Sequence, residues 1–287
     1  MDIAIGLPTG GPHTSRDSIL KWAERAEQRG LAALVLSDRL LAGGYDTIVA
    51  ATAAAMATET IPIVTSVILG PLRTNVASFA KQVASIDRLS GGRLFLGLGV
   101  GSREDDYVAS EVDFHQRGKA LDAQILRLRE IFNGGLAGFG PAPTRAGGPP
   151  MLIGGKSDAA LARVTALADG WICPTSAGPD GFARGAARIR DLWSGSGREG
   201  EPLLYALAPR FVLGPAATER AREGVRAYNA GHAQSTTREQ MAEVLTTPAQ
   251  VREAIAAFEA AGCGLISVNA FDANPDQVDY LADALTR

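Results

Sequence analysis

The sequence predicts an α/β protein, a (β/α)8 TIM barrel in a single domain that spans residues 1–287. Short apolar runs alternate with helix-length amphipathic segments, which is typical of repeated βαβ units around a parallel sheet. Several runs are apolar at consecutive positions, as expected for strands that are covered on both faces. Eight such runs are present, and that number favours a closed barrel over an open sheet.

The predicted strands are rich in aliphatic and β-branched residues and are separated by turn or helix signals. In chain order they are Ile3–Leu7, Ala33–Ser37, Ile63–Leu69, Arg93–Val100, Met151–Ile153, Gly170–Cys173, Leu204–Leu213 and Gly264–Asn269. Pro209 lies within the seventh run. Because proline has no backbone N–H to donate to a neighbouring strand, we expect this strand to be bulged or shorter than the run.

Start and stop signals delimit the first predicted helix. Thr14 and Asp17 have the spacing of a capping box, and Gly30 follows as a residue that favours the left-handed conformation at a helix end. Apolar residues then repeat at helical spacing over 76–86 and over 121–132. These stripes predict two further helices, each with one face buried against the sheet.

Two helices near the C-terminus are predicted from their first residues. Thr247–Pro248 and Asn274–Pro275 each combine an N-cap with proline at the first helical position. Gln250 and Gln277 stand three residues after the two caps, where a capping box places glutamine. We therefore expect one helix to begin at each of these prolines.

Two segments interrupt the alternation of strands and helices. Gly134–Pro150 is rich in glycine and proline and poor in apolar residues, which predicts a long loop. Gly214–Thr246 is an excursion with weak helical character. We interpret both as short insertions in the barrel, and neither has the character of a domain boundary.

Composition and charge restrict the partners. Hydrophobic residues make up 46% and charged residues 21% of the chain, and the net charge is −3. Nucleic acids and anionic membranes require clustered Lys and Arg, so neither partner is expected, and a small-molecule substrate is favoured. The opening residues lack a basic region followed by an apolar run, which predicts a cytoplasmic protein.

No metal site or disulfide is expected. Cys173 and Cys263 are isolated in apolar contexts, which predicts two buried thiols. His232 has no second histidine at a ligand spacing.

The residues that follow the strands are the candidates for chemistry, because active sites of parallel barrels lie at the carboxyl ends of the strands. Gly154–Gly155 lies between a strand and a helix, where bare backbone N–H groups and the helix N-terminus are able to hold a phosphate. Lys156 would add positive charge. A simple tight turn is the alternative interpretation.

Several motifs together resemble the bacterial luciferase-like monooxygenase family, which includes FMN- and F420-dependent flavin oxidoreductases. They are Thr65–Arg73, Ala80–Arg103, Met151–Ser157, Ala168–Ile172 and Thr247–Phe258. The resemblance covers most of the chain and is weakest over the two insertions. It implies a (β/α)8 barrel whose strand ends hold FMN or, alternatively, coenzyme F420.

The resemblance also implies which residues contact the cofactor. It implies a non-prolyl cis peptide and a bulge at Ser66–Val67, behind the central ring of the flavin. It implies that Gly99 and Gly101 leave room for the cofactor and that Gly154–Gly155 takes its phosphate. The expected cofactor-binding residues are Ser37, Asp38, Thr65, Ser66, Val67, Gly99, Gly101, Gly154, Gly155, Lys156 and Thr175. A buried Ser66 hydroxyl bonded to backbone and an Asp38 helix cap are the alternatives.

The catalytic residue stays open, with Arg39, His13 and Glu104 as candidates. Some F420-dependent sugar-phosphate dehydrogenases of the family carry a proton-donating histidine at the position of Arg39. A guanidinium stays charged at neutral pH and cannot shuttle protons, so that mechanism is not expected here. Arg39 would instead hold an anionic substrate or pair with an acid such as Glu104, in an acidic run (104–106) expected to be a solvated loop.

The predicted function is a flavin-dependent monooxygenase that uses reduced FMN and oxygen on a small organic substrate. A separate flavin reductase would supply the reduced cofactor, and the family resemblance is compatible with a homodimer. With F420, hydride would instead pass directly between the ring and the substrate.

Two alternatives belong to other classes. One is a flavin-binding protein without turnover. An open apolar pocket lined by Leu7, Leu40, Trp171 or the Gly134–Pro150 loop would argue against it. The other is a barrel lyase with Lys156 as a Schiff-base amine.

Overall fold

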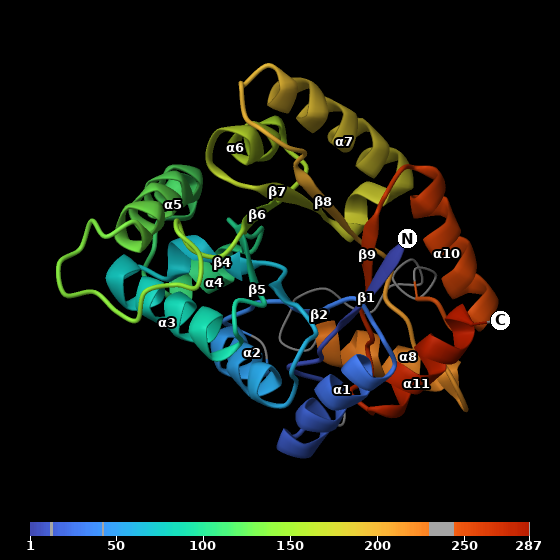
Figure 1. The fold of residues 1–287 in the computed structure, drawn as a ribbon. Coiled ribbons are helices and arrows are strands. Elements are labelled where there is room, and N and C mark those ends of the chain that lie inside the picture. Colours follow the sequence, from blue (N-terminus) through green and yellow to red (C-terminus); the bar gives the residue numbers. More distant parts are fainter. Residues whose placement is uncertain (12–13, 42, 230–243, 287) are drawn as a thin grey trace.

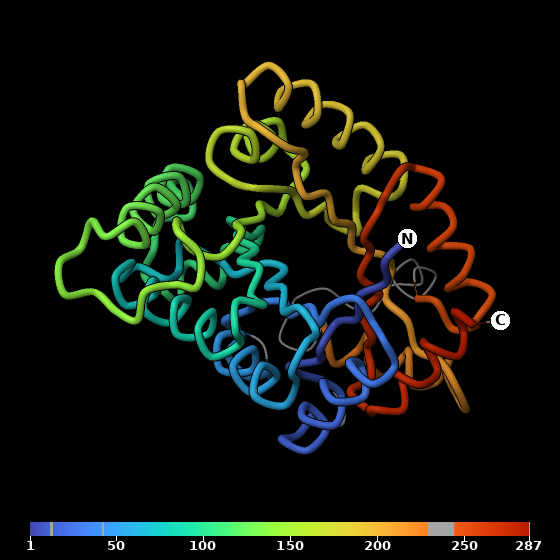
Figure 2. Tube along the Cα trace, viewed as in Figure 1, coloured from blue at the N-terminus to red at the C-terminus, as the bar shows by residue number. Residues whose placement is uncertain are grey.

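The strands form a closed parallel barrel with helices on its outside (Figure 1). The computed structural model describes residues 1–11, 14–41, 43–229 and 244–286. Neighbouring strands follow the order β3-β2-β1-β9-β8-β7-β6-β5-β4, and β3 also pairs with β5 and so closes the circle. Figure 2 traces the chain once around the barrel, so that the first and last strands become neighbours. The predicted (β/α)8 barrel is confirmed.

The bounds of the elements follow the predicted alternation. The strands are β1 Asp2–Gly6, β2 Leu34–Leu36, β3 Ile63–Thr65, β4 Ile68–Leu69, β5 Leu94–Gly99, β6 Met151–Gly154, β7 Gly170–Cys173, β8 Leu203–Leu207 and β9 Leu265–Val268. The helices are α1 Arg16–Gln28, α2 Thr47–Met56, α3 Val76–Leu89, α4 Glu104–Ala109, α5 Arg117–Phe132, α6 Asp158–Leu167, α7 Gly178–Ser194, α8 Ala217–Asn229, α10 Pro248–Ala260 and α11 Asp276–Leu285.

The third predicted strand is divided into β3 and β4 by a bulge. Val64 pairs with Phe95 and Ile68 pairs with Leu98, so this strand advances four residues while β5 advances three. The extra residue lies at Ser66–Val67, and the peptide bond there is cis. Both features implied by the resemblance are therefore confirmed.

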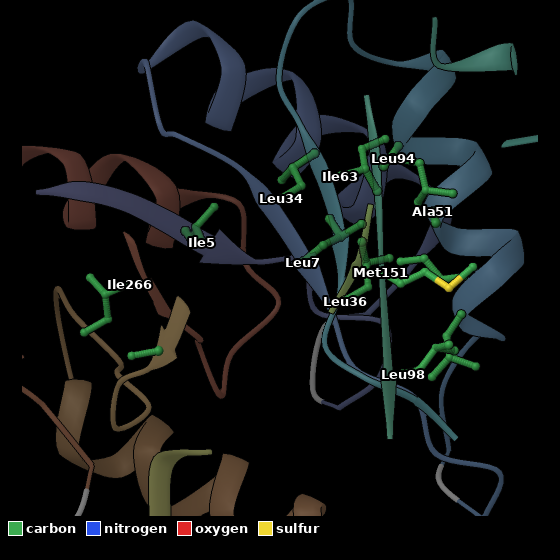
Figure 3. Packing of buried hydrophobic residues seen from close by; sticks show 14 of the residues in the cluster. Ile5, Leu7, Leu34, Leu36, Ala51, Ile63, Leu94, Leu98, Met151 and Ile266 are labelled. Carbon is green, nitrogen blue, oxygen red and sulfur yellow. The ribbon is translucent and has the colours of Figure 1, made fainter. Parts of the chain in front are cut away.

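Side chains of the strands alternate between the barrel interior and the surrounding helices. The outer layer is the larger core, and it contains Ile5, Leu34, Ile63 and Leu94 from neighbouring strands (Figure 3). The interior holds a smaller cluster at mid-height, made of Ala4, Ala33, Val35, Val64, Leu152, Ile172 and Tyr205. Ligands of parallel barrels bind at the carboxyl ends of the strands, so these ends are where the site is sought.

The structure corrects two predicted helix starts. Ser15, one residue after Thr14, caps α1, because its hydroxyl accepts from Ser18 N at 3.1 Å while Ser15 N donates to Ser18 Oγ at 2.8 Å. The last helix begins at Asp276, one residue later than predicted. There Gln277 turns away from the cap, and its Nε2 donates to Leu213 O at 2.9 Å.

The other helix predictions are confirmed. Gly30 follows α1 with a φ of +70°. The capping box of α10 joins Thr247 and Gln250 as expected. The two apolar stripes lie in α3 and α5.

The insertions behave as the sequence predicts within the described residues. Gly134–Pro150 contains neither helix nor strand. β8 ends at Leu207, before Pro209, and the chain then continues through single bridges from Phe211 to Leu245 and Ala270. The helix expected in the second insertion is α8, and residues 230–243 of that insertion lie outside the described part.

The two thiols are buried and not joined to each other, as predicted. Burial raises the pKa of Cys173 to about 12 and that of Cys263 to about 11. Both groups are therefore neutral thiols at physiological pH. Across the described ranges, no helix combines the length and apolar character needed to cross a bilayer.

Candidate active site

One end of the barrel collects the predicted cofactor residues. Ser37 follows β2, Ser66 follows β3, Gly99 ends β5, Gly154 ends β6 and Thr175 follows β7. All these strands are parallel, so their carboxyl ends lie on the same side of the molecule. The structure therefore brings these predicted residues to one end of the barrel, which we call the barrel mouth, and their contact with a cofactor stays a prediction.

A polar floor lies beneath the mouth. Ser66 and Ser267 lie beside the Tyr205 hydroxyl, and burial raises the pKa of Tyr205 above its ordinary value although both serines oppose the rise. Ser267 Oγ donates to Asn269 Oδ1 at 2.7 Å. The Asn269 side chain in turn lies against Gly6, where a Cβ would come within 2.4 Å of Oδ1. Tyr205 is therefore a neutral phenol that is able to donate a hydrogen bond.

Two hydroxyls of this floor have no hydrogen-bond partner of their own. Ser66 is 8% exposed and Tyr205 is 1% exposed. The hydroxyls of Ser66 and Ser267 lie close enough to Tyr205 to lower its pKa, but among the described residues neither the Ser66 nor the Tyr205 oxygen makes a hydrogen bond of regular geometry. The alternative interpretation of Ser66 as a hydroxyl bonded to backbone is therefore wrong. Buried hydroxyls are normally satisfied, so these two are suited to a polar atom of a bound ligand.

The neighbouring Thr65 differs from Ser66. Its hydroxyl donates to Gly97 O at 2.9 Å and accepts from Gly97 N at 2.8 Å. Thr65 therefore fastens β3 to β5, and its predicted cofactor contact stays a prediction.

The glycines at the mouth first make room for the bulge. A Cβ on Gly99 would lie 2.5 Å from Val67 Cγ2, and one on Gly154 would lie 2.6 Å from Val67 Cγ1. A Cβ on Gly101 would lie 2.8 Å from Leu69 Cδ2. The space that we assigned to the cofactor at Gly99 and Gly101 is thus occupied by these two side chains, and cofactor contacts there stay predictions.

Asp38 joins the ends of three elements. Its carboxylate accepts hydrogen bonds from Leu69 N at 3.0 Å, Thr47 Oγ1 at 3.0 Å and Arg73 Nη2 at 3.2 Å. Burial opposes the charge of Arg73, but Asp38 and Asp46 outweigh it and raise the pKa of Arg73. The cap of α2 is Asp46, so the alternative of Asp38 as that cap is wrong. The Ser37 carbonyl also accepts from Thr47 Oγ1, at 2.9 Å.

Arg39 is held by acids of α4. Its Nε lies 2.9 Å from Asp106 Oδ2, and its Nη2 lies 3.8 Å from Asp105 Oδ2. Asp106 is 1% exposed and also accepts from Leu41 N at 2.9 Å. The predicted partner Glu104 is exposed, and the predicted solvated loop is a helix whose phase turns Asp106 inward. Arg39 is therefore part of a clamp between the loop after β2 and α4.

The predicted phosphate turn is present. Gly155 has a φ of +137°, and Ser157 caps α6 by accepting from Ala160 N at 3.3 Å. Lys156 is exposed, and its Nζ donates to Ser176 O at 3.3 Å. Thr175 Oγ1 donates to Ala208 O at 3.3 Å. Phosphate binding at this turn stays a prediction.

Two of the residues expected to line an apolar pocket, Trp171 and Leu7, face the surrounding helices instead. Trp171 is 1% exposed, its ring stacks on Phe182 of α7 at 5.7 Å, and a Cβ on Gly185 would meet it at 2.4 Å. Strand alternation explains this correction, because Ile172 faces the interior and Trp171 therefore faces the helices. Leu7 is buried in the same outer layer, whereas Leu40 is 52% exposed.

Metal ligands, the histidines and the residues that the sequence interpretation missed complete the description of the site. Within the described ranges, no group of three or more His, Cys, Asp or Glu side chains is placed to hold a metal ion. His13 and His232 lie outside the described residues, so their predicted roles are not addressed. The sequence interpretation missed Tyr205, Ser267 and Asn269, although alternation along their strands would have placed all three in the interior.

Comparison with protein-family models gives one match. A model described as luciferase-like monooxygenase matches residues 2–264 of this chain.

Comparison with curated proteins gives partial matches. An uncharacterized protein of Mycobacterium tuberculosis (strain ATCC 25618 / H37Rv) is 36% identical over 134 residues, which is 42% of this chain and 45% of that protein. The F420-dependent glucose-6-phosphate dehydrogenase of Kribbella flavida is 28% identical over 151 residues, which is 49% of this chain and 45% of that protein. The matched stretches thus cover about half of the length of these relatives.

Comparison with solved structures gives matches over the whole fold. Monooxygenase RslO1 from Streptomyces bottropensis has a TM-score of 0.81 at 22% identity, covering 100% of this chain and 99% of that one. The oxygenating constituent of 3,6-diketocamphane monooxygenase of Pseudomonas putida, in complex with FMN, has a TM-score of 0.70 at 17% identity, covering 98% and 96%. At these identities the likeness establishes the fold.

Proposed function

Because this chain belongs to the luciferase-like monooxygenase family, we propose that it is a monooxygenase that uses reduced FMN and oxygen on a small organic substrate. The choice of FMN over F420 rests on Arg39, a permanently charged residue that is paired with acids. Its guanidinium lies against Asp105 and Asp106, at the position where F420-dependent sugar-phosphate dehydrogenases resembling this chain carry a proton-donating histidine. A separate flavin reductase as the source of the reduced cofactor is part of the proposal.

The residues of the mouth fit a flavin. The unpartnered hydroxyls of Ser66 and Tyr205 are suited to a polar edge of a bound ring or to a substrate oxygen. Val67 presents an aliphatic surface beside them, packed against Gly99 and Gly154. A reduced flavin, when bound, would supply the electrons that activate oxygen.

The chain itself would bind, orient and shield. Ser66 and Tyr205 would donate hydrogen bonds from the floor, and burial keeps the Tyr205 phenol protonated for this role. Asp38 and Asp106 would hold the loop after β2 in place, since each accepts hydrogen bonds from elements that border the mouth. A preorganised wall of this kind excludes water and fixes the substrate relative to the ring.

The named activity of one relative favours a second candidate function. The Kribbella flavida protein is an F420-dependent dehydrogenase, so direct hydride transfer with F420 is the alternative. Membership of a monooxygenase family favours an oxidoreductase over a non-catalytic flavin-binding protein and over a Schiff-base lyase.

Titration of the purified protein with FMN and, separately, with F420 tests the proposal through the change in cofactor fluorescence. We expect micromolar binding of FMN and no response to F420. Oxygen consumption with reduced FMN would then identify substrates. Binding of F420 alone would replace the proposal by hydride transfer, and failure of both cofactors to bind would overturn it.

A further inference from the structure

Arg210 follows a strand end at the barrel mouth, and its guanidinium lies beside two aromatic rings that also contact each other. It stands three residues beyond Leu207, the last residue of β8. Its guanidinium carbon lies 4.6 Å from the ring centroid of Tyr228 in α8 and 4.8 Å from that of Phe271, which follows β9. The Arg210 carbonyl accepts from Leu245 N at 2.9 Å, which fixes the backbone of this residue. The cation is thus positioned by elements from distant parts of the sequence.

No carboxylate compensates this charge among the described residues. Burial lowers the pKa of Arg210, and Tyr228 opposes this effect through an electrostatic interaction and a side-chain hydrogen bond, without a carboxylate. Arg198 at the other end of the barrel gives a direct contrast. Its guanidinium also stacks on a ring, Trp193 at 3.9 Å, but it lies 3.5 Å from Asp169 Oδ1 as well.

Ring contacts and one hydrogen bond with a neutral phenol do not balance the burial of a charge. The attraction between a cation and a ring is smaller than the cost of removing a guanidinium from water. A guanidinium does not escape this cost by losing its proton, because it remains charged at any physiological pH. Arg210 is therefore a partly buried cation that an anion would complete.

We propose that Arg210 is an anion-binding subsite of the barrel mouth, which takes a carboxylate, phosphate or sulfonate group of the bound molecule. The two rings hold the guanidinium, and its planar set of donors suits two oxygens of such a group. This inference rests on the proposed function only in assuming that the mouth binds the ligand. The anion is either the phosphate of the flavin or an acidic group of the substrate.

The first test measures anion binding without a flavin. Inorganic phosphate and sulfate are the probes, with chloride at matched ionic strength as the reference, and the melting temperature and the Kd for phosphate are the readouts. We compare the wild type with Arg210→Met, Arg210→Lys and the stacked control Arg198→Met. Phosphate should stabilise the wild type and Arg198→Met, and Arg210→Met should bind it about tenfold or more weakly. Arg210→Lys should keep part of the response.

Variant stability separates a binding role from a structural one. Without anions, Arg210→Met should be as stable as the wild type, whereas Arg198→Met should be less stable because Asp169 loses a partner. Arg210→Gln is the second neutral variant. If both neutral variants fail to fold, the guanidinium is a structural clamp and the proposal is overturned. An unchanged phosphate response in Arg210→Met, or no response in the wild type, also overturns it.

A second test identifies the source of the anion. FMN differs from riboflavin by its phosphate. The affinity for FMN divided by the affinity for riboflavin therefore reports on a phosphate contact. A lower ratio in Arg210→Met assigns the subsite to the flavin phosphate, and an unchanged ratio with loss of the phosphate response assigns it to the substrate. Failure of the flavin proposal would appear as absent flavin binding with the phosphate response intact, so the two failures are distinguishable.

Discussion

The two ends of the barrel treat their polar groups differently. At the amino-terminal end, Arg93 donates hydrogen bonds to the carbonyls of Ala55, Thr58, Ile61 and Ser90, between 2.7 and 2.9 Å. At the mouth, the hydroxyls of Ser66 and Tyr205 have no partner among the described residues, and the guanidinium of Arg210 faces two rings. Arg93 therefore uses its donors to hold the fold, whereas the mouth contains, beside the structural hydrogen bonds of Asp38 and Asp106, two hydroxyls that are available for a ligand.

The largest expected loss of stability comes from a substitution at the amino-terminal end of the barrel. Arg93→Ala removes the donor of four backbone carbonyls, and we expect the free energy of unfolding to fall by about 3 kcal/mol. Urea unfolding measures this loss, and the FMN affinity of the folded variant should be unchanged. Arg127→Ala is the control, since its exposed pair with Glu130 should contribute about 0–1 kcal/mol. A loss no larger than that of the control would contradict the comparison.

The next effect disturbs the mouth. Gly99→Ala places a Cβ 2.5 Å from Val67 Cγ2, so the bulge must shift. We expect a loss of about 1–3 kcal/mol in stability and weaker flavin binding, measured by thermal unfolding and fluorescence titration. Gly264→Ala is the matched control, because nothing lies within 4 Å of its added Cβ. Unaltered flavin affinity in Gly99→Ala would show that Val67 is not part of the ligand site.

A smaller effect depends on pH at the amino-terminal end. Burial acts to raise the pKa of Glu27, but hydrogen bonds from Thr60, Ile61 and Glu59 outweigh it and lower the pKa to about 2. A carboxyl whose pKa is lowered by folding stabilises the protein above its ordinary pKa of 4.5, and this contribution is lost as the pH falls towards about 2. Glu27→Gln should therefore be less stable than the wild type near neutral pH.

Unfolding by urea at several pH values tests this prediction. The difference in stability between Glu27→Gln and the wild type should shrink through the window between the two pKa values, 4.5 and about 2. The FMN affinity should not change. A difference that is constant across this window would show that the hydrogen bonds to Glu27 do not depend on its charge.

The smallest expected change in stability comes from removing the unpartnered hydroxyls of the mouth. Tyr205→Phe and Ser66→Ala remove hydroxyls that have no partner, so the free energy of unfolding should change by less than about 0.5 kcal/mol or rise. Ligand affinity should nevertheless fall several-fold. Thr65→Val is the neighbouring control, since its hydroxyl makes two hydrogen bonds and its loss should cost about 1–2 kcal/mol. If Thr65→Val and Ser66→Ala lowered the free energy of unfolding equally, Ser66 would be a structural residue like Thr65.

The sequence predicts features that depend on local spacing. Strand alternation, the shortened strand before Pro209 and the α10 capping box all follow from residues within a few positions of one another. The start of α1 was one residue off because Thr14 and Ser15 are both suitable caps. The structure uses Ser15, whose hydroxyl and backbone pair with Ser18.

Local strand alternation would have found Tyr205, Ser267 and Asn269, whereas the roles of Asp106 and Arg210 depend on distant partners. Asp106 differs from Asp105 and Glu104 in helix phase, and Arg39 meets it across the mouth. Arg210 is unusual through its surroundings, since Phe271 lies far along the chain. Sequence patterns alone do not show which charges lack a partner after folding.

The bulge in the third strand changes what one strand can present. In a regular strand, neighbouring side chains point to opposite faces, so two adjacent residues cannot both face the barrel interior. The extra residue lets Ser66 face Tyr205 while Val67 covers Gly99 and Gly154, both on the interior. Two adjacent residues thereby supply a hydrogen-bonding group, at Ser66, and an apolar surface, at Val67. Variation at Ser66 would alter hydrogen bonding and variation at Val67 would alter shape, so the two properties of this strand are able to diverge independently.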